Sequence, residues 1–221
     1  MLQARYRKDY EGEFIITRST WSGGKKTQER EWIANPIENH HISGRAICIG
    51  SEDDCDWFDY TILQRHRGGL LGSKKLQTYG VSDIAKNMRL DFALETDAGS
   101  LKNLVDTGYH ENNIVYTTPR NCLSWPGFFY TIPYNPLLCK EAMLVYLAAF
   151  DGHQEVFLLG YNTATSVGQS TWIDQISQIF KAYTSVQFSV VCRPHMTPLP
   201  WLEYPNVRNL DLREFISYAD I

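Results

Sequence analysis

The stretch from Asn135 to Asn162 constrains the fold most, because it joins an amphipathic helix to a strand with no polar face. Asn135 can cap a helix, and Pro136 suits the first turn because that position needs no backbone donor. Gly152 is placed to end the helix. Apolar residues recur between them at helical spacing, at Leu137, Met143, Leu144, Leu147 and Phe150.

The strand after this helix is an unbroken apolar run from Val156 to Leu159. A run without alternation is typical of a strand buried on both faces, as in a parallel α/β sheet. It ends at Gly160, Tyr161 and Asn162, where open α/β sheets place their ligands. The alternative is that the strand leads into an ordinary loop.

Short apolar runs and helical patterns alternate along most of the remaining chain. The runs predict strands at residues 45–50, 69–72, 90–94, 113–117, 186–192 and 207–210, and the helical patterns cover 57–66, 99–106, 172–183 and the end of the chain. This alternation predicts an α/β fold, a Rossmann-like, doubly wound and mostly parallel sheet of six or seven strands. Right-handed crossovers would bring the strand ends to one edge of that sheet.

The first 44 residues read differently and predict a β-hairpin appendage. Phe14–Thr17 and Thr27–Ile33 have strand composition and flank a turn signal at Ser22–Lys25, and residues 3–8 could add a third strand. The chain is therefore divided into a hairpin extension, 1–44, and a Rossmann-like domain, 45–221. The predicted tip carries Arg18, Trp21, Lys25 and Lys26, which could hold a phosphate backbone and stack a base of DNA. The alternative is that the tip is a solvated turn.

Composition describes an ordinary globular protein, with 43% apolar and 21% charged residues and a net charge of −4. Residues 1–45 carry eight Lys and Arg against six Asp and Glu, which permits an anionic partner at that end. The five cysteines are odd in number and lack CxxC spacing, which indicates a reducing compartment. Without a signal-peptide pattern or a membrane-length apolar run, we expect a cytoplasmic protein with no membrane partner.

Polar residues follow several predicted strands and would meet at the shared edge. Those expected to bind the donor substrate of a group-transfer reaction are Gly50, Ser51, Ser73, Lys74, Arg120, Asn135, Gly160, Tyr161 and Asn162. Asp97 is the first candidate for a catalytic base and His195 the second; each could equally be a surface or capping residue. Cations for a diphosphate, polar groups for sugar hydroxyls and a proton acceptor are the requirements of glycosyl transfer from a nucleotide sugar.

Other chemistries lack their motifs. The sequence contains no GxSxG elbow, no GxxxxGK[ST] loop and no zinc-ligand spacing. The acidic run Asp53–Asp56 follows the first strand, where helix capping explains it, and no DxD motif marks a metal-dependent transferase. No metal is predicted.

The chain resembles single-Rossmann glycosyltransferases, in particular bacterial sialyltransferase-like proteins. The resemblance is carried by a strand ending in Ile49-Gly50-Ser51, the helix 142–150, Gly152 and the strand 156–161. It implies a nucleotide-sugar donor at the sheet edge. The chain departs from the pattern where Glu52, Asp53 and Asp54 make the first turn acidic, and where Asn162 replaces an acidic residue.

A narrower resemblance, to T-even-type phage transferases that place glucose or arabinose on hydroxymethylcytosine, is carried by the hairpin and the run 29–46. It implies a UDP-sugar donor, a flipped hydroxymethylcytosine in double-stranded DNA as acceptor, and a location in the host cytoplasm. Two alternatives stay open at this point. One is a sialyltransferase-like enzyme acting on a glycan or small molecule, and the other is a non-catalytic phage binding protein.

Overall fold

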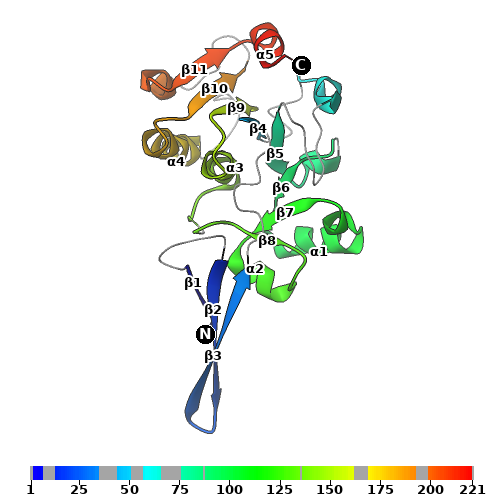
Figure 1. The fold of residues 1–221 in the computed structure, drawn as a ribbon, viewed down its shortest axis with the longest axis vertical. Helices are drawn as coiled ribbons and strands as arrows, with labels where there is room; N and C mark the ends of the chain where they lie inside the picture. Colours follow the sequence, from blue (N-terminus) through cyan, green and yellow to red (C-terminus); the bar gives the residue numbers. More distant parts are fainter. Residues whose placement is uncertain are drawn as a thin grey trace.

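Two separate sheets organise the computed structural model (Figure 1). The structure describes residues 2–6, 13–34, 44–50, 57–65, 76–86, 88–134, 136–161, 169–192 and 199–220. A three-stranded antiparallel sheet comes first in the chain, and an eight-stranded sheet follows.

The main sheet is parallel throughout, because every one of its strand pairs is parallel. Its strands are β4 (Arg45–Ile49), β5 (Gln77–Val81), β6 (Phe92–Leu94), β7 (Ile114–Thr117), β8 (Tyr130–Thr131), β9 (Glu155–Leu159), β10 (Gln187–Val191) and β11 (Val207–Leu210). They lie in the order β11-β10-β9-β4-β5-β6-β7-β8. The predicted Rossmann-like α/β fold is confirmed, with eight strands in place of six or seven.

Helices cover both faces of this sheet. The α-helices are α1 (Ala98–Asp106), α2 (Pro119–Ser124), α3 (Lys140–Phe150), α4 (Gln169–Ala182) and α5 (Leu212–Ala219), and the 3₁₀ helices are η2 (Tyr60–Arg65), η3 (Ile84–Lys86), η4 (Tyr109–Glu111) and η5 (Leu199–Glu203). Alternate residues of the central strands enter different cores. Ala46 and Cys48 pack in the core under α3 and α4, whereas Ile47 and Ile49 pack with residues of α1 and α5. This is the double burial that the apolar runs predicted.

The start of α3 differs from the prediction. The helix begins at Lys140 with Cys139 as its N-cap, so the interpretation of Asn135 and Pro136 as cap and first turn is wrong. The amide of Leu138 donates to the Pro136 carbonyl at 2.9 Å, and this tight turn delays the helix. Leu137, expected on the buried face, is 92% exposed. The helix ends near Gly152, whose φ of 90° suits glycine, as predicted.

The strand beside β4 was missed. The predicted second strand, 69–72, lies outside the described residues, and the strand that pairs with β4 on the side away from β9 is β5. The polar residue Thr78 in β5 is fully buried, and its hydrogen-bonding groups are satisfied by Asp91. The Thr78 amide and hydroxyl both donate to Asp91 at 2.8 and 3.0 Å, and the Asp91 amide donates back to the Thr78 hydroxyl. The helix predicted at residues 57–66 is instead a shorter 3₁₀ helix, η2, at Tyr60–Arg65.

A buried polar network lies under the carboxyl end of α3. The Tyr79 hydroxyl donates to Asp151 at 2.7 Å and lies 2.9 Å from Nε2 of His153. Since one hydroxyl proton serves Asp151, the His153 contact needs the Nε2–H tautomer. Burial raises the pKa of Asp151 to about 7, although the Tyr79 hydrogen bond acts in the opposite direction. The network anchors the helix end to β5.

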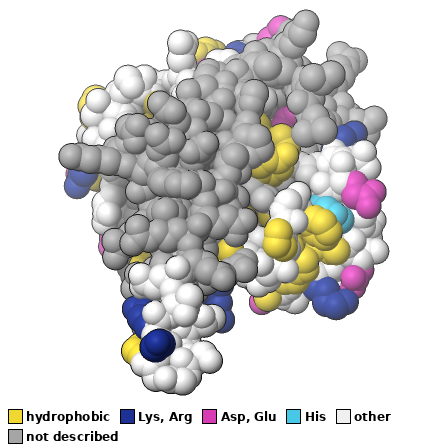
Figure 2. Space-filling model, turned by 60° about the horizontal axis from the view of Figure 1, so that its bottom comes forward, with side chains coloured by type: hydrophobic (Ala, Val, Ile, Leu, Met, Phe, Trp, Pro, Cys, Tyr) yellow, Lys and Arg dark blue, Asp and Glu magenta, His cyan; other side chains and the backbone are white. Residues whose placement is uncertain are grey.

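The amino-terminal sheet consists of β1 (Leu2–Tyr6), β2 (Glu13–Ser22) and β3 (Lys25–Ala34) in antiparallel pairing, so the predicted hairpin is confirmed. Gly23 and Gly24 form its turn with φ values of 55° and 77°, which the primed hairpin turns require. The hairpin projects away from the main sheet on the side of β8 and α2 (Figure 1). Figure 2 views the molecule from that side.

Candidate functional site

The strand order reverses between β4 and β9. The chain passes outward from β4 through β5, β6 and β7 to β8, then returns to the opposite side of β4 at β9 and continues to β11. In open α/β sheets the crevice beyond the carboxyl ends at such a reversal is the ligand site. The pairing runs from Arg45 with Glu155 to Ile49 with Leu159, so the two strands end side by side.

Two predicted donor-binding residues, Gly50 and Gly160, occupy these strand ends. The Gly50 amide donates to the Leu159 carbonyl at 2.9 Å, which extends the ladder by one step. A Cβ on Gly50 would lie only 2.9 Å from the Gly160 carbonyl oxygen, and Gly160 has a φ of 78°. Glycine at both positions therefore allows the backbone segments that follow β4 and β9 to leave the sheet while remaining in close contact with each other. Because the Gly50 amide already donates to Leu159, it is not a free hydrogen-bond donor for a ligand.

The first turn of α3 lies beside this reversal. The hydroxyl of Tyr161, which follows β9, donates to the Glu141 carbonyl at 3.1 Å, and the Cys139 amide donates to Oε1 of Gln175 on α4 at 2.8 Å. Tyr161 itself is 1% exposed and contacts Trp172 edge to face, with ring centroids 6.1 Å apart. Its position at the strand end is as predicted, but its side chain is packed inward.

A buried carboxylate joins the same helix turn to the end of β6. Glu95, the first residue after that strand, accepts a hydrogen bond from Lys140 at 2.7 Å, another from the Ser82 hydroxyl, and those of the Thr96 and Asp97 amides at 2.7 and 2.8 Å. Burial alone would raise the pKa of Glu95, but the hydrogen bonds from Lys140, Ser82 and the Asp97 amide together lower it. Glu95 is thus held as a charged, fully bonded anchor for α3.

Asp97, the predicted base, is an exposed residue at this edge. It is the N-cap of α1 and accepts the Ser100 amide at 2.8 Å. The pKa of its carboxyl is lowered, chiefly by hydrogen bonds from the Ser100 amide and hydroxyl. A lowered pKa keeps the carboxylate charged and makes it a weak base.

Arg120 is also exposed near this edge, since α2 directly follows β7. It was expected where strand becomes loop, but it is the second residue of α2. The neighbouring Asn121 fixes the helix, donating to the Thr96 carbonyl and the Thr117 hydroxyl, both at 3.0 Å. The ends of β6 and β7 are joined in this way.

Several predicted site residues lie outside the described part of the chain and receive no geometry. These are Ser51, Ser73, Lys74, Asn135, Asn162 and His195. The predicted DNA contacts belong to the other sheet: Trp21 is 69% exposed, and it pairs across the hairpin with Lys26, which is exposed like Lys25. Arg18 lies further along β2, paired in register with Glu29. Figure 2 shows Lys and Arg side chains on this projecting hairpin.

The Glu95–Lys140 pair was not predicted. Glu95 directly follows the buried strand β6, so its position carries the same signal as that of Asp97 two residues later. Lys140 carried no local signal, because only the folded sheet brings the start of α3 to the end of β6.

The described residues contain no group of three or more His, Cys, Asp or Glu side chains arranged to hold a metal ion. In the same part of the chain, every helix is too short or too polar to cross a bilayer.

Comparison with known proteins gives one broad structural similarity. No protein-family model matches the chain, and no curated protein matches it. A sialyltransferase from Campylobacter jejuni, solved in complex with a substrate analogue, cytidine-5'-monophosphate, superposes with a TM-score of 0.47 and 12% identity, over 75% of this chain and 88% of that chain. The class of fold, a doubly wound parallel α/β sheet whose strand order reverses between β4 and β9, rests on the strand order of the chain itself.

The contact between the two glycines predicts a position-specific cost. Gly50→Ala should lower the free energy of unfolding by about 1–3 kcal/mol, because the new methyl group meets a backbone oxygen that cannot move freely. Gly44→Ala is the matched control, since its nearest neighbour would be a flexible Gln154 side chain at 3.9 Å, and should change stability by less than about 0.5 kcal/mol. Urea unfolding measures both. Equal stability of the two variants would contradict the close approach.

Removing the Lys140 charge should destabilise the protein by about 1–3 kcal/mol at neutral pH in Lys140→Met, because Glu95 remains buried and loses its cationic partner. The lowered pKa of Glu95 stabilises the fold above the carboxyl's ordinary value of about 4 and loses that effect as pH falls. The difference from wild type should therefore shrink on acidification. Lys102→Met removes an exposed pair with Asp106 and should cost under about 0.5 kcal/mol. A pH-independent difference would refute this account.

Proposed function

We propose that the chain is a glycosyltransferase that moves a sugar from a nucleotide-sugar donor, with a UDP-sugar preferred, to a hydroxyl acceptor. The observation that carries the proposal is the reversal of strand order between β4 and β9, with the first turn of α3 fixed beside it. A helix amino terminus favours anionic groups, so a diphosphate is the natural ligand there. The resemblance of residues 142–161 to single-Rossmann glycosyltransferases points to the same donor.

The reaction needs positive charge on the departing nucleoside diphosphate and a base on the acceptor hydroxyl. Arg120 is an exposed cation near the edge, and Ser73 and Lys74 are proposed as further donor contacts. Lys140 is occupied by Glu95, so its role is to position α3. For the base, a carboxylate whose pKa is lowered accepts a proton poorly near neutral pH, which counts against Asp97. The other candidate, His195, is therefore the proposed base.

The proposed acceptor is hydroxymethylcytosine in double-stranded DNA. Its support is the projecting hairpin, on which the exposed Trp21 pairs with Lys26 and Lys25 lies next to the turn. Residues that face each other in an antiparallel pair share a face, so an aromatic ring and a cation are presented together. Such a surface suits a phosphate backbone and an unstacked base.

The donor class is tested by thermal shift with UDP-, CMP- and GDP-sugars on the wild-type chain. We expect a UDP-sugar to raise the melting temperature most, and the rise to shrink in Arg120→Ala. A larger rise with a CMP-sugar would replace the donor with that of a sialyltransferase-like enzyme. Indifference to all three, together with capture of a stoichiometric protein partner, would favour a binding protein and reject the enzyme.

The acceptor and the base are tested by mass spectrometry of hydroxymethylated DNA after incubation with a UDP-sugar. His195→Ala should abolish the mass gain and Asp97→Asn should retain most of it. A Lys25→Ala and Lys26→Ala double variant should weaken use of long duplexes while leaving the donor thermal shift unchanged. Absence of mass gain on DNA, with donor binding intact, would remove DNA as the acceptor and keep the donor site.

A further inference from the structure

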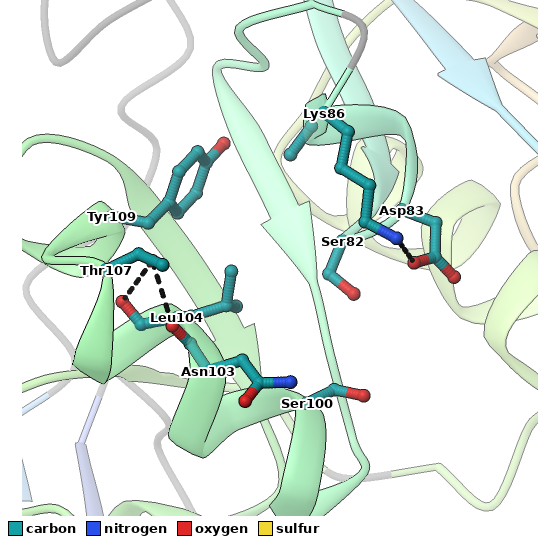
Figure 3. A pocket seen from close by; sticks show the side chains of 9 residues that line it. Ser82, Asp83, Lys86, Ser100, Asn103, Leu104, Thr107 and Tyr109 are labelled. Atoms are coloured by element: carbon teal, nitrogen blue, oxygen red, sulfur yellow. Dashed lines mark hydrogen bonds and ion pairs between the residues drawn. The ribbon is translucent and has the colours of Figure 1, made fainter.

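A pocket of about 250 Å³ opens between α1 and the turn that follows β5 (Figure 3). Ser82, Asp83 and Lys86 line it from the turn and η3, and Ser100, Asn103 and Leu104 line it from α1. It lies beside the ends of β5 and β6, on the far side of β5 from the reversal between β4 and β9. Ser82 connects the two places, because its hydroxyl is bonded to Glu95.

The polar groups of the pocket come from more than one wall. Asn103, an exposed residue, extends from α1 with both a donor and an acceptor, and Ser100 lies next to it, facing the turn of Ser82 (Figure 3). Tyr109 forms part of the wall through its ring, whereas its hydroxyl is buried near Leu90 and is not one of the polar groups that a ligand could reach.

The charge on the walls is balanced. Asp83 and Lys86 form an ion pair at 2.8 Å, and the other lining residues are neutral. Asp97 lies just outside, bonded to the Ser100 amide, so an anionic ligand would meet a carboxylate without a free cation. Ala85, Leu104 and the Tyr109 ring supply apolar surface between the polar groups.

These features together select a ligand class. The volume is below the roughly 300–1,000 Å³ of sites for drug-sized molecules, so a single small ring is the right size. A flat base needs two apolar walls for stacking, and here one aromatic ring lines the pocket. A sugar ring, with hydroxyls pointing in several directions and apolar CH groups between them, matches hydroxyl and amide groups on separate walls.

We propose that this pocket is a binding site for a neutral monosaccharide unit, separate from the nucleotide-sugar site. Asn103 pairs with two neighbouring sugar hydroxyls, and Leu104 and Tyr109 contact the ring. The inference does not depend on the transfer reaction, because binding here needs no donor.

The test is an NMR titration of the full chain with methyl β-glucopyranoside, methyl β-galactopyranoside, glucuronate and 5-hydroxymethyl-2'-deoxycytidine. We expect saturable shifts from at least one neutral glycoside, confined to residues 82–86 and 100–109. Asn103→Ala should weaken that binding about five- to tenfold, as expected for the loss of hydrogen bonds to an uncharged ligand. Lys102→Ala, on the same helix but outside the pocket, should leave it unchanged.

Three results would overturn the proposal. One is the absence of shifts in this region with both neutral glycosides up to their solubility. Another is tighter binding of glucuronate or of the nucleoside than of either glycoside. The third is equal affinity in Asn103→Ala and wild type. Asn103 is exposed, so its replacement leaves the core intact, and one-dimensional spectra of the variant confirm its fold.

Discussion

The parallel pairing of β4 with β9 is the constraint on which the rest of the structure depends. It joins the first strand of the main sheet to one that comes after half of the domain, with β5 to β8 between them in the sequence. Both strands are buried on both faces, which commits their residues to two cores. Where they end, two glycines permit a backbone contact that any side chain would prevent. The reversal of strand order is a consequence of this pairing.

Helix α3 is held in place beside the reversal of strand order. Its body packs against β4, β5 and β9, and its first turn is fixed from three directions, by Tyr161, Gln175 and Glu95. The far end is anchored through Asp151 to Tyr79. Polar contacts at both ends of α3 and apolar contacts along its body together fix the position of the helix on the sheet. A helix amino terminus favours anionic groups, and the proposal of a nucleotide-sugar donor rests on this property of α3.

The sequence could predict the elements whose signal is local. The run Val156–Leu159 and the turn at Gly23 and Gly24 were found because apolar continuity and turn chemistry are written in adjacent residues. Strand β5 was missed because Thr78 is polar and becomes buried only through Asp91. The start of α3 was misplaced because a capping motif at Asn135 says nothing of the turn that Leu138 closes. Lys140 could not be found, since its partner Glu95 is distant in sequence.

The most direct test of the account is hydrogen–deuterium exchange of the full chain with and without a saturating UDP-sugar. The account predicts that protection increases at the carboxyl ends of β4 and β9 and in the first turn of α3, with the hairpin unchanged in the absence of DNA. Protection confined to the amino ends of the strands, or to the β1–β3 sheet, would contradict it. The carboxyl ends of β4 and β9 would then not be the nucleotide-sugar site.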